Sequence, residues 1–314
     1  MARFEALDHG IVCIDSGYVD NEYAAIYLIQ QGDEVAIIET GTFRTIPHVL
    51  AVLSELGIKH SQIKYVIPTH IHLDHAGGAS GMMALFKQAR LIIHPRGARH
   101  MIDPSRLIAG SKVVYGKEAF NRLYGEIKAI NEQRVDIADD LDVYAIGDRE
   151  LVFIDTPGHA KHHFCIYDAQ SKGIFTGDTF GLSYPPLKNR AHGLIPTSSP
   201  VDFNPEAMLM SVDRLLDYQP ERMYLTHFGE IDTPQNKIAD FKLWISDYLT
   251  LCERIKPADE TSTKELEQAL RQMTVEKLGA TAGCSEKELL ALMSSDIRLN
   301  AQGLAIWWQA RNNA

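Results

Sequence analysis

The stretch Thr69-His70-Ile71-His72-Leu73-Asp74-His75 holds four residues of metal-ligand type within six positions. Residues two apart point to the same side of an extended chain, so His70 and His72 can reach one cation. Asp74 and His75 lie past a bend that leads into two glycines, and they can reach a second cation. Imidazole nitrogen and carboxylate oxygen are suitable ligands for zinc and for its first-row neighbours. The stretch therefore predicts a metal site.

Three later residues of the same chemical type follow other apolar runs. They are His159 after Pro157-Gly158, Asp178 after Gly177, and His227 after Thr226. A lone histidine is usually an ordinary surface or core residue, but this density of ligands in a chain with 13 histidines favours a metal. Loops at strand ends are where a rigid scaffold presents its chemistry, so we expect all seven residues to share one site.

Short apolar runs of strand type recur along most of the chain, and polar or glycine-rich residues end each of them. They cover residues 24–29, 35–38, 65–67, 91–93, 151–154, 173–175 and 223–225. A helix with one apolar stripe is expected at 46–56, and a more helical insertion at 102–133. After residue 232 the strand signals stop, and helices are predicted at 236–255, 263–278, 286–293 and 296–311. Two of these helices begin with predicted capping boxes, Ser262 with Glu265 and Ser285 with Glu288.

This pattern predicts a catalytic domain at residues 1–232 and a helical C-terminal extension at 233–314. The 314 residues are 45% hydrophobic and 23% charged, as is usual for a globular protein. The net charge of -10 argues against a nucleic-acid partner, whose phosphates need basic residues. Neither a basic and then apolar leader nor an apolar run of about 20 residues is found, so we expect a cytoplasmic protein without a membrane partner.

The signature His-x-His-x-Asp-His, followed by a lone His, a lone Asp and a final His, resembles that of the metallo-β-lactamase superfamily. The resemblance extends from residue 11 to about residue 229. It implies an α/β (α+β) fold, a four-layer αβ/βα sandwich with its site at one edge of two sheets, here followed by the helical extension. It also implies two divalent metal ions, with zinc as the first expectation and iron or manganese as the alternatives.

The resemblance also assigns a role to each predicted ligand. His70, His72 and His159 would hold the first metal. Asp74, His75 and His227 would hold the second, and Asp178 would bridge both. Asp74 and Asp178 are the expected catalytic residues, and no organic cofactor is expected. The family motif usually has an aspartate before Thr-Gly, whereas this chain has Glu39 before Thr40-Gly41, and we expect Glu39 to hydrogen-bond a ligand histidine.

These assignments predict a hydrolase that attacks a small ester, thioester or lactone with a metal-bridging hydroxide, because a bound cation lowers the pKa of water toward ~7. The chain is similar to the second glyoxalase, with a histidine at His163, but it lacks the Asn-Pro-Phe-x-Arg element of that enzyme and looks like an uncharacterised branch. Two alternatives stay open, a mononuclear iron persulfide dioxygenase and a metal-bearing binding protein with little turnover. The expected partner is a small-molecule substrate, and a homodimer is allowed.

Overall fold

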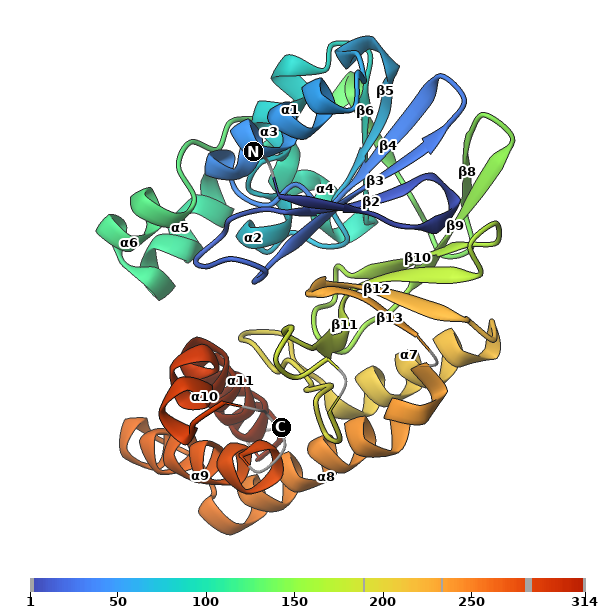
Figure 1. Cartoon of the computed structure of the whole chain (residues 1–314). Helices are drawn as coiled ribbons and strands as arrows, with labels where there is room; N and C mark the ends of the chain where they lie inside the picture. Colours follow the sequence, from blue (N-terminus) through green and yellow to red (C-terminus); the bar gives the residue numbers. More distant parts are fainter. Residues whose placement is uncertain (1–2, 189, 233, 280–283, 313–314) are drawn as a thin grey trace. The chain divides into compact units, whose positions relative to one another are not determined.

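The computed structural model describes residues 3–188, 190–232, 234–279 and 284–312, which belong to two compact units. Unit 1 comprises Met1–Asp155, His162–Gly177 and Arg222–Glu230. Unit 2 comprises Thr156–Lys161, Asp178–Glu221 and Ile231–Ala314. Figure 1 labels most of the strands and helices named below. The predicted domains divide the chain once, after residue 232, whereas each compact unit combines three segments of the chain. The predicted division stays a prediction.

The first sheet lies in unit 1 and has the strand order β1-β2-β3-β4-β5-β6-β7. Its strands are β1 (Phe4–Ala6), β2 (Ile11–Asp15), β3 (Ala25–Gln31), β4 (Glu34–Ile38), β5 (Ile63–Ile67), β6 (Arg90–Ile93) and β7 (Val135–Ile137). The strands β1 to β4 pair antiparallel, whereas β4 to β7 pair parallel. Helices connect the parallel strands, because a parallel pair needs a crossover segment.

Successive residues of the central strands face opposite sides, and both sides are buried. On one side, Ile26 and Leu28 of β3 pack with residues of α1 (Ile46–Glu55), α3 (Ala79–Leu85) and α4 (Pro95–Ile102). On the other side, Tyr27 and Ile29 pack with aromatic residues of the second sheet. The apolar runs read from the sequence are continuous for this reason, since a strand covered on both faces has no polar side.

The second sheet has the strand order β13-β12-β11-β10-β9-β8. Its strands are β8 (Val143–Ile146), β9 (Arg149–Asp155), β10 (Phe164–Asp168), β11 (Gly173–Leu182), β12 (Arg222–His227) and β13 (Gly229–Asp232). Unit 1 also contains the short helix α2 (Leu73–Ala76) and the insertion helices α5 (Ser105–Tyr115) and α6 (Lys117–Leu123). The prediction that β11 stops at residue 175 was wrong, because the strand continues through Asp178 with every residue buried. His227 is the last residue of β12 rather than part of a loop after it.

The helices of unit 2 are α7 (Pro205–Asp217), α8 (Ile238–Ile255), α9 (Glu260–Leu278), α10 (Glu286–Leu292) and α11 (Ser294–Asn312). The four helices predicted after residue 232 are present, with α8 and α11 packed on α9. The capping box of Ser285 with Glu288 is confirmed. The one predicted for Ser262 with Glu265 was wrong, because α9 begins earlier and Asp259 caps it by accepting from the Ser262 backbone N–H.

In the part of the chain that the structure describes, no helix combines the length and the apolar character that crossing a bilayer requires. The four cysteines, all within the described ranges, form no disulfide with one another.

Candidate metal centre

Asp74, His75 and His227 come together within unit 1, as the sequence predicted. Helix α2 starts directly after His72 and carries Asp74 and His75 on its first turn, while β12 ends at His227. The Asp74 Oδ2 atom lies 3.8 Å from His75 Nε2 and 3.6 Å from His227 Nε2. Each of the three residues offers one donor atom, and the three atoms lie within 4.8 Å of one another. This spacing fits ligands around one cation.

Hydrogen bonds fix which ring nitrogen of these histidines can bind a cation. His227 Nδ1 lies 2.8 Å from the Tyr23 backbone carbonyl oxygen, and His75 Nδ1 lies 2.9 Å from Glu39 Oε1. A carbonyl or an ionised carboxylate only accepts, so Nδ1 carries the proton in both rings. Neutral His227 and His75 therefore have unprotonated Nε2 atoms, which are the atoms nearest Asp74 Oδ2. Two imidazole nitrogens and a carboxylate oxygen are a suitable donor set for a divalent transition metal.

Glu39 lies at the centre of the hydrogen bonds that support this cluster. Its Oε1 accepts from the Thr69 hydroxyl at 2.6 Å, the Thr226 hydroxyl at 2.9 Å and His75 Nδ1, and its Oε2 accepts from the Thr69 backbone N–H at 3.2 Å. The residue is 1% exposed and has a positive φ of 67°, which is uncommon for a residue other than glycine. The expected hydrogen bond between Glu39 and a histidine of the predicted ligand set is present, and His75 is the partner.

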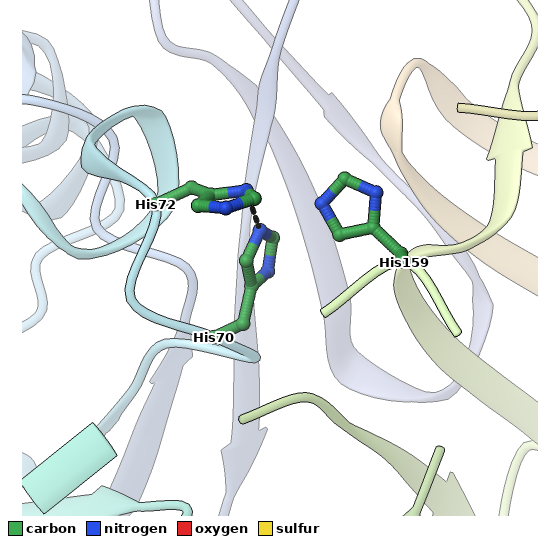
Figure 2. Close-up of side chains that lie close together, drawn as sticks. All are labelled: His70, His72 and His159. Atoms are coloured by element: carbon green, nitrogen blue, oxygen red, sulfur yellow. Dashed lines mark hydrogen bonds between the residues drawn. The ribbon is translucent and has the colours of Figure 1, made fainter. Parts of the chain in front are cut away.

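His70 and His72 lie side by side in the loop after β5. His70 Nε2 and His72 Nδ1 are 2.9 Å apart, the contact that the dashed line marks in Figure 2. The Thr69 hydroxyl gives its hydrogen to Glu39, so it accepts from His70 Nδ1 at 3.1 Å. His70 therefore has an unprotonated Nε2, which lies beside His72 Nδ1, and two adjacent ring nitrogens suit two ligands of one cation.

His159 and Asp178, the remaining predicted ligands, lie in unit 2. His159, which is also labelled in Figure 2, follows Gly158, and Asp178 lies on β11. The His159 Nε2 atom is 3.5 Å from Asp178 Oδ2, and both side chains are buried. A side chain at Gly158 would collide with the Met208 backbone at 2.3 Å, so glycine is required in the turn that presents His159. The role of each of the seven residues as a ligand stays a prediction.

Sequence reasoning missed several groups that support these side chains. The hydroxyls of Thr69 and Thr226 hydrogen-bond Glu39, and the Tyr23 carbonyl accepts from His227, as described above. Gly177 has a φ of +49°, and a Cβ atom there would lie 2.4 Å from His163 Nε2 and 2.5 Å from the Thr69 hydroxyl. His163 itself is buried with its ring centroid 4.9 Å from that of His70. A glycine directly before a predicted ligand was the one signal in the sequence that could have pointed to such crowding.

Comparison with known proteins gives the family. A family model described as the metallo-beta-lactamase superfamily matches residues 19–227. The human acyl-coenzyme A thioesterase MBLAC2 is 26% identical over 188 residues, which cover 55% of this chain and 64% of the human protein. The N-acyl homoserine lactonase AttM of Azorhizobium caulinodans is 31% identical over 114 residues, 36% of this chain and 39% of that protein. This chain thus spans less than two thirds of the length of both relatives.

A solved structure confirms the predicted fold class. ST1585 from Sulfolobus tokodaii, described as an archaeal metallo-beta-lactamase superfamily protein, superposes with a TM-score of 0.63. The superposition covers 95% of this chain and 99% of that chain at 20% sequence identity, so the likeness concerns the fold. The mixed α/β architecture with two sheets and C-terminal helices agrees with this fold. Because the family model also covers about two thirds of the chain, this protein belongs to the metallo-β-lactamase superfamily.

Proposed function

We propose that this protein is a metal-dependent hydrolase that cleaves an acyl thioester. The observation that carries the proposal is the shared orientation of His75 and His227, whose Nδ1 atoms are hydrogen-bonded to acceptors while their Nε2 atoms lie beside Asp74. This arrangement supports a cation at that position. The similarity to the human acyl-coenzyme A thioesterase MBLAC2 supports the thioester as substrate.

In this proposal the site holds two metal ions. His70, His72 and His159 would hold the first metal. Asp74, His75 and His227 would hold the second metal, and Asp178 would bridge the two ions. The histidine-rich donor set fits zinc, which we propose as the resident metal, and iron or manganese would fit the same ligands.

Bound metals of this kind polarise a carbonyl group and make water a nucleophile near neutral pH. The chain itself supplies a proton acceptor. The Asp74 side chain is 24% exposed, whereas His75 beside it is 1% exposed. A partly exposed carboxylate can be reached by water and substrate, so we assign to Asp74 the acceptance of the proton that the attacking water loses. The buried groups around it keep the ligands oriented and do not need to move.

Aromatic side chains next to His227 offer a surface for the acyl group. The Tyr23 ring centroid lies 5.8 Å from that of His227, and the Tyr18 ring lies 6.1 Å from Tyr23. The Tyr18 hydroxyl donates to the Tyr124 hydroxyl at 3.2 Å. Burial, with smaller effects of Tyr18, Tyr115 and Asp74, raises the pKa of Tyr124 far above its ordinary value, so this phenol stays neutral. Tyr18 and Tyr23 are half-buried aromatic residues, which suit contact with an apolar acyl chain.

The first prediction concerns activity and its need for metal. Protein loaded with zinc is expected to release coenzyme A from acetyl-, hexanoyl- and palmitoyl-coenzyme A, and removal of the metal with a chelator is expected to abolish this activity. A thiol-reactive dye measures the release, and zinc, manganese and iron are then added back in turn. Bis(p-nitrophenyl) phosphate serves as the substrate that should not react.

Three results would contradict the proposal. One iron per chain with oxygen consumption on glutathione persulfide would assign the protein to the dioxygenases. Turnover of N-hexanoyl homoserine lactone without thioester cleavage would favour the second candidate, a lactonase, which the similarity to AttM supports. Metal-loaded protein that cleaves no member of the panel would be a binding protein.

The second prediction concerns the acyl surface. The substitution Tyr18→Ala is expected to raise KM for hexanoyl-coenzyme A about tenfold, because an aromatic contact contributes about 1.4 kcal/mol. KM for acetyl-coenzyme A should change little. Tyr18→Phe keeps the ring and removes the hydroxyl, so it serves as the matched control and should retain the preference for the longer chain. An equal rise of KM for both substrates in Tyr18→Ala would show that the ring does not contact the acyl chain.

A further inference from the structure

Helix α11 holds a buried loop of unit 2 through one asparagine. Asn300 is 5% exposed, and its Oδ1 accepts from the Ser198 backbone N–H at 2.7 Å. Its Nδ2 donates to the Pro196 carbonyl and to the Tyr248 hydroxyl, both at 3.2 Å. The Ser198 hydroxyl donates to the Asn300 carbonyl at 3.2 Å. Through its side chain and its backbone, Asn300 thus holds Pro196 and Ser198, the two neighbours of Thr197.

The loop and the helix also approach each other unusually closely. A Cβ atom at Gly303, one turn after Asn300, would lie 1.4 Å from the Ser198 carbonyl oxygen. Only glycine can occupy this position without moving the helix or the loop. The C-terminal helix is therefore shaped to receive residues 196–198, in addition to packing on α8 and α9.

Thr197 connects this loop to the predicted metal ligands of unit 2. Its hydroxyl donates to the Asp178 carbonyl oxygen at 3.2 Å, and the His159 Nδ1 atom lies 3.0 Å away. A hydroxyl has a single hydrogen, so Thr197 accepts from the Nδ1–H of His159. Neutral His159 then has an unprotonated Nε2, which is the nitrogen that lies 3.5 Å from Asp178 Oδ2. The ring is held in the tautomer that a metal ligand needs.

We infer that the C-terminal helix α11 positions the metal ligand His159, with Asn300 holding the loop and Thr197 orienting the imidazole. The inference rests on the proposed function, in which His159 binds a metal. Asn300 and Thr197 are positioning residues, because they act through His159 and through the loop. The helical extension then has a defined part in building the site, and this part does not depend on which substrate is cleaved.

The test measures zinc affinity by competition with a chromogenic chelator, alongside kcat and KM for a cleaved thioester. Thr197→Val keeps the shape of the side chain and removes the hydroxyl, and it is expected to weaken the binding of one zinc ion ~10–100-fold. Thr197→Ser is expected to restore the affinity. Asn300→Leu should resemble Thr197→Val, with kcat reduced more than KM is raised.

Gln309→Ala is the matched control on the same helix, because Gln309 donates to the Pro257 carbonyl, far along α11 from the loop. Zinc affinity in this variant should equal that of the unchanged protein. If Thr197→Val binds zinc like Gln309→Ala, the inference is wrong although the proposed function stands. If Asn300→Leu fails to fold, the inference is tested by the zinc affinities of Thr197→Val and Thr197→Ser. An unchanged protein that binds no zinc would overturn the proposed function itself.

Discussion

The substitution Glu39→Gln is expected to weaken zinc binding ~10–100-fold, the range found when the supporting partner of a metal ligand is lost. The amide retains a single acceptor oxygen for the Thr69 and Thr226 hydroxyls and for His75 Nδ1. Its NH2 group would then face the Thr69 backbone N–H, so two donors would meet in a buried site. The neutral amide also attracts the His75 proton less strongly than the carboxylate does. Chelator competition measures the affinity.

Glu34→Gln is the matched control for this substitution. Glu34 begins β4, the strand after which Glu39 follows, and it pairs with Lys64 at 2.6 Å on a partly exposed surface. Exposed ion pairs contribute about 0–1 kcal/mol, so this control should keep its zinc affinity and nearly all of its stability. Equal zinc affinity in the two variants would show that Glu39 does not orient a metal ligand.

Much of the fold could be predicted because the central strands are covered on both faces. Residues 24–29 and 35–38 stand out as continuous apolar runs, and they form β3 and β4. The edge strands β1 and β7 gave no such signal, because their residues are largely exposed or half-buried. The second half of β11 could not be predicted either, although all of its residues are buried. Its polar residues Thr176, Asp178 and Thr179 are buried, but in the sequence they resemble the polar end of a strand.

The candidate ligands could be predicted because their residue types and spacing are specific. The groups that support the ligands could not be predicted. Some of them are backbone atoms, and others belong to residues far away in the sequence. The Tyr23 carbonyl that accepts from His227 leaves no mark on the residue type. Asn300 lies 102 residues from Ser198, the loop residue whose N–H it binds. An asparagine inside a helix gives no hint of such a contact.

Asp178→Ala is expected to lose both bound zinc ions and to lower kcat about a thousandfold, because the two metals together supply several kcal/mol of transition-state stabilisation. In the proposal Asp178 would hold both ions, and its carboxylate would neutralise part of their charge. His227→Ala removes a ligand of the second metal alone, so it should retain one zinc ion. Metal analysis of the purified variants gives the number of ions per chain.

Asp213→Ala provides the control within unit 2. Asp213 lies on α7 with its side chain 58% exposed, and it pairs with Lys242 at 2.6 Å. Its removal should change neither the zinc content nor kcat. An Asp178→Ala variant that keeps two zinc ions would refute the bridging role proposed for Asp178.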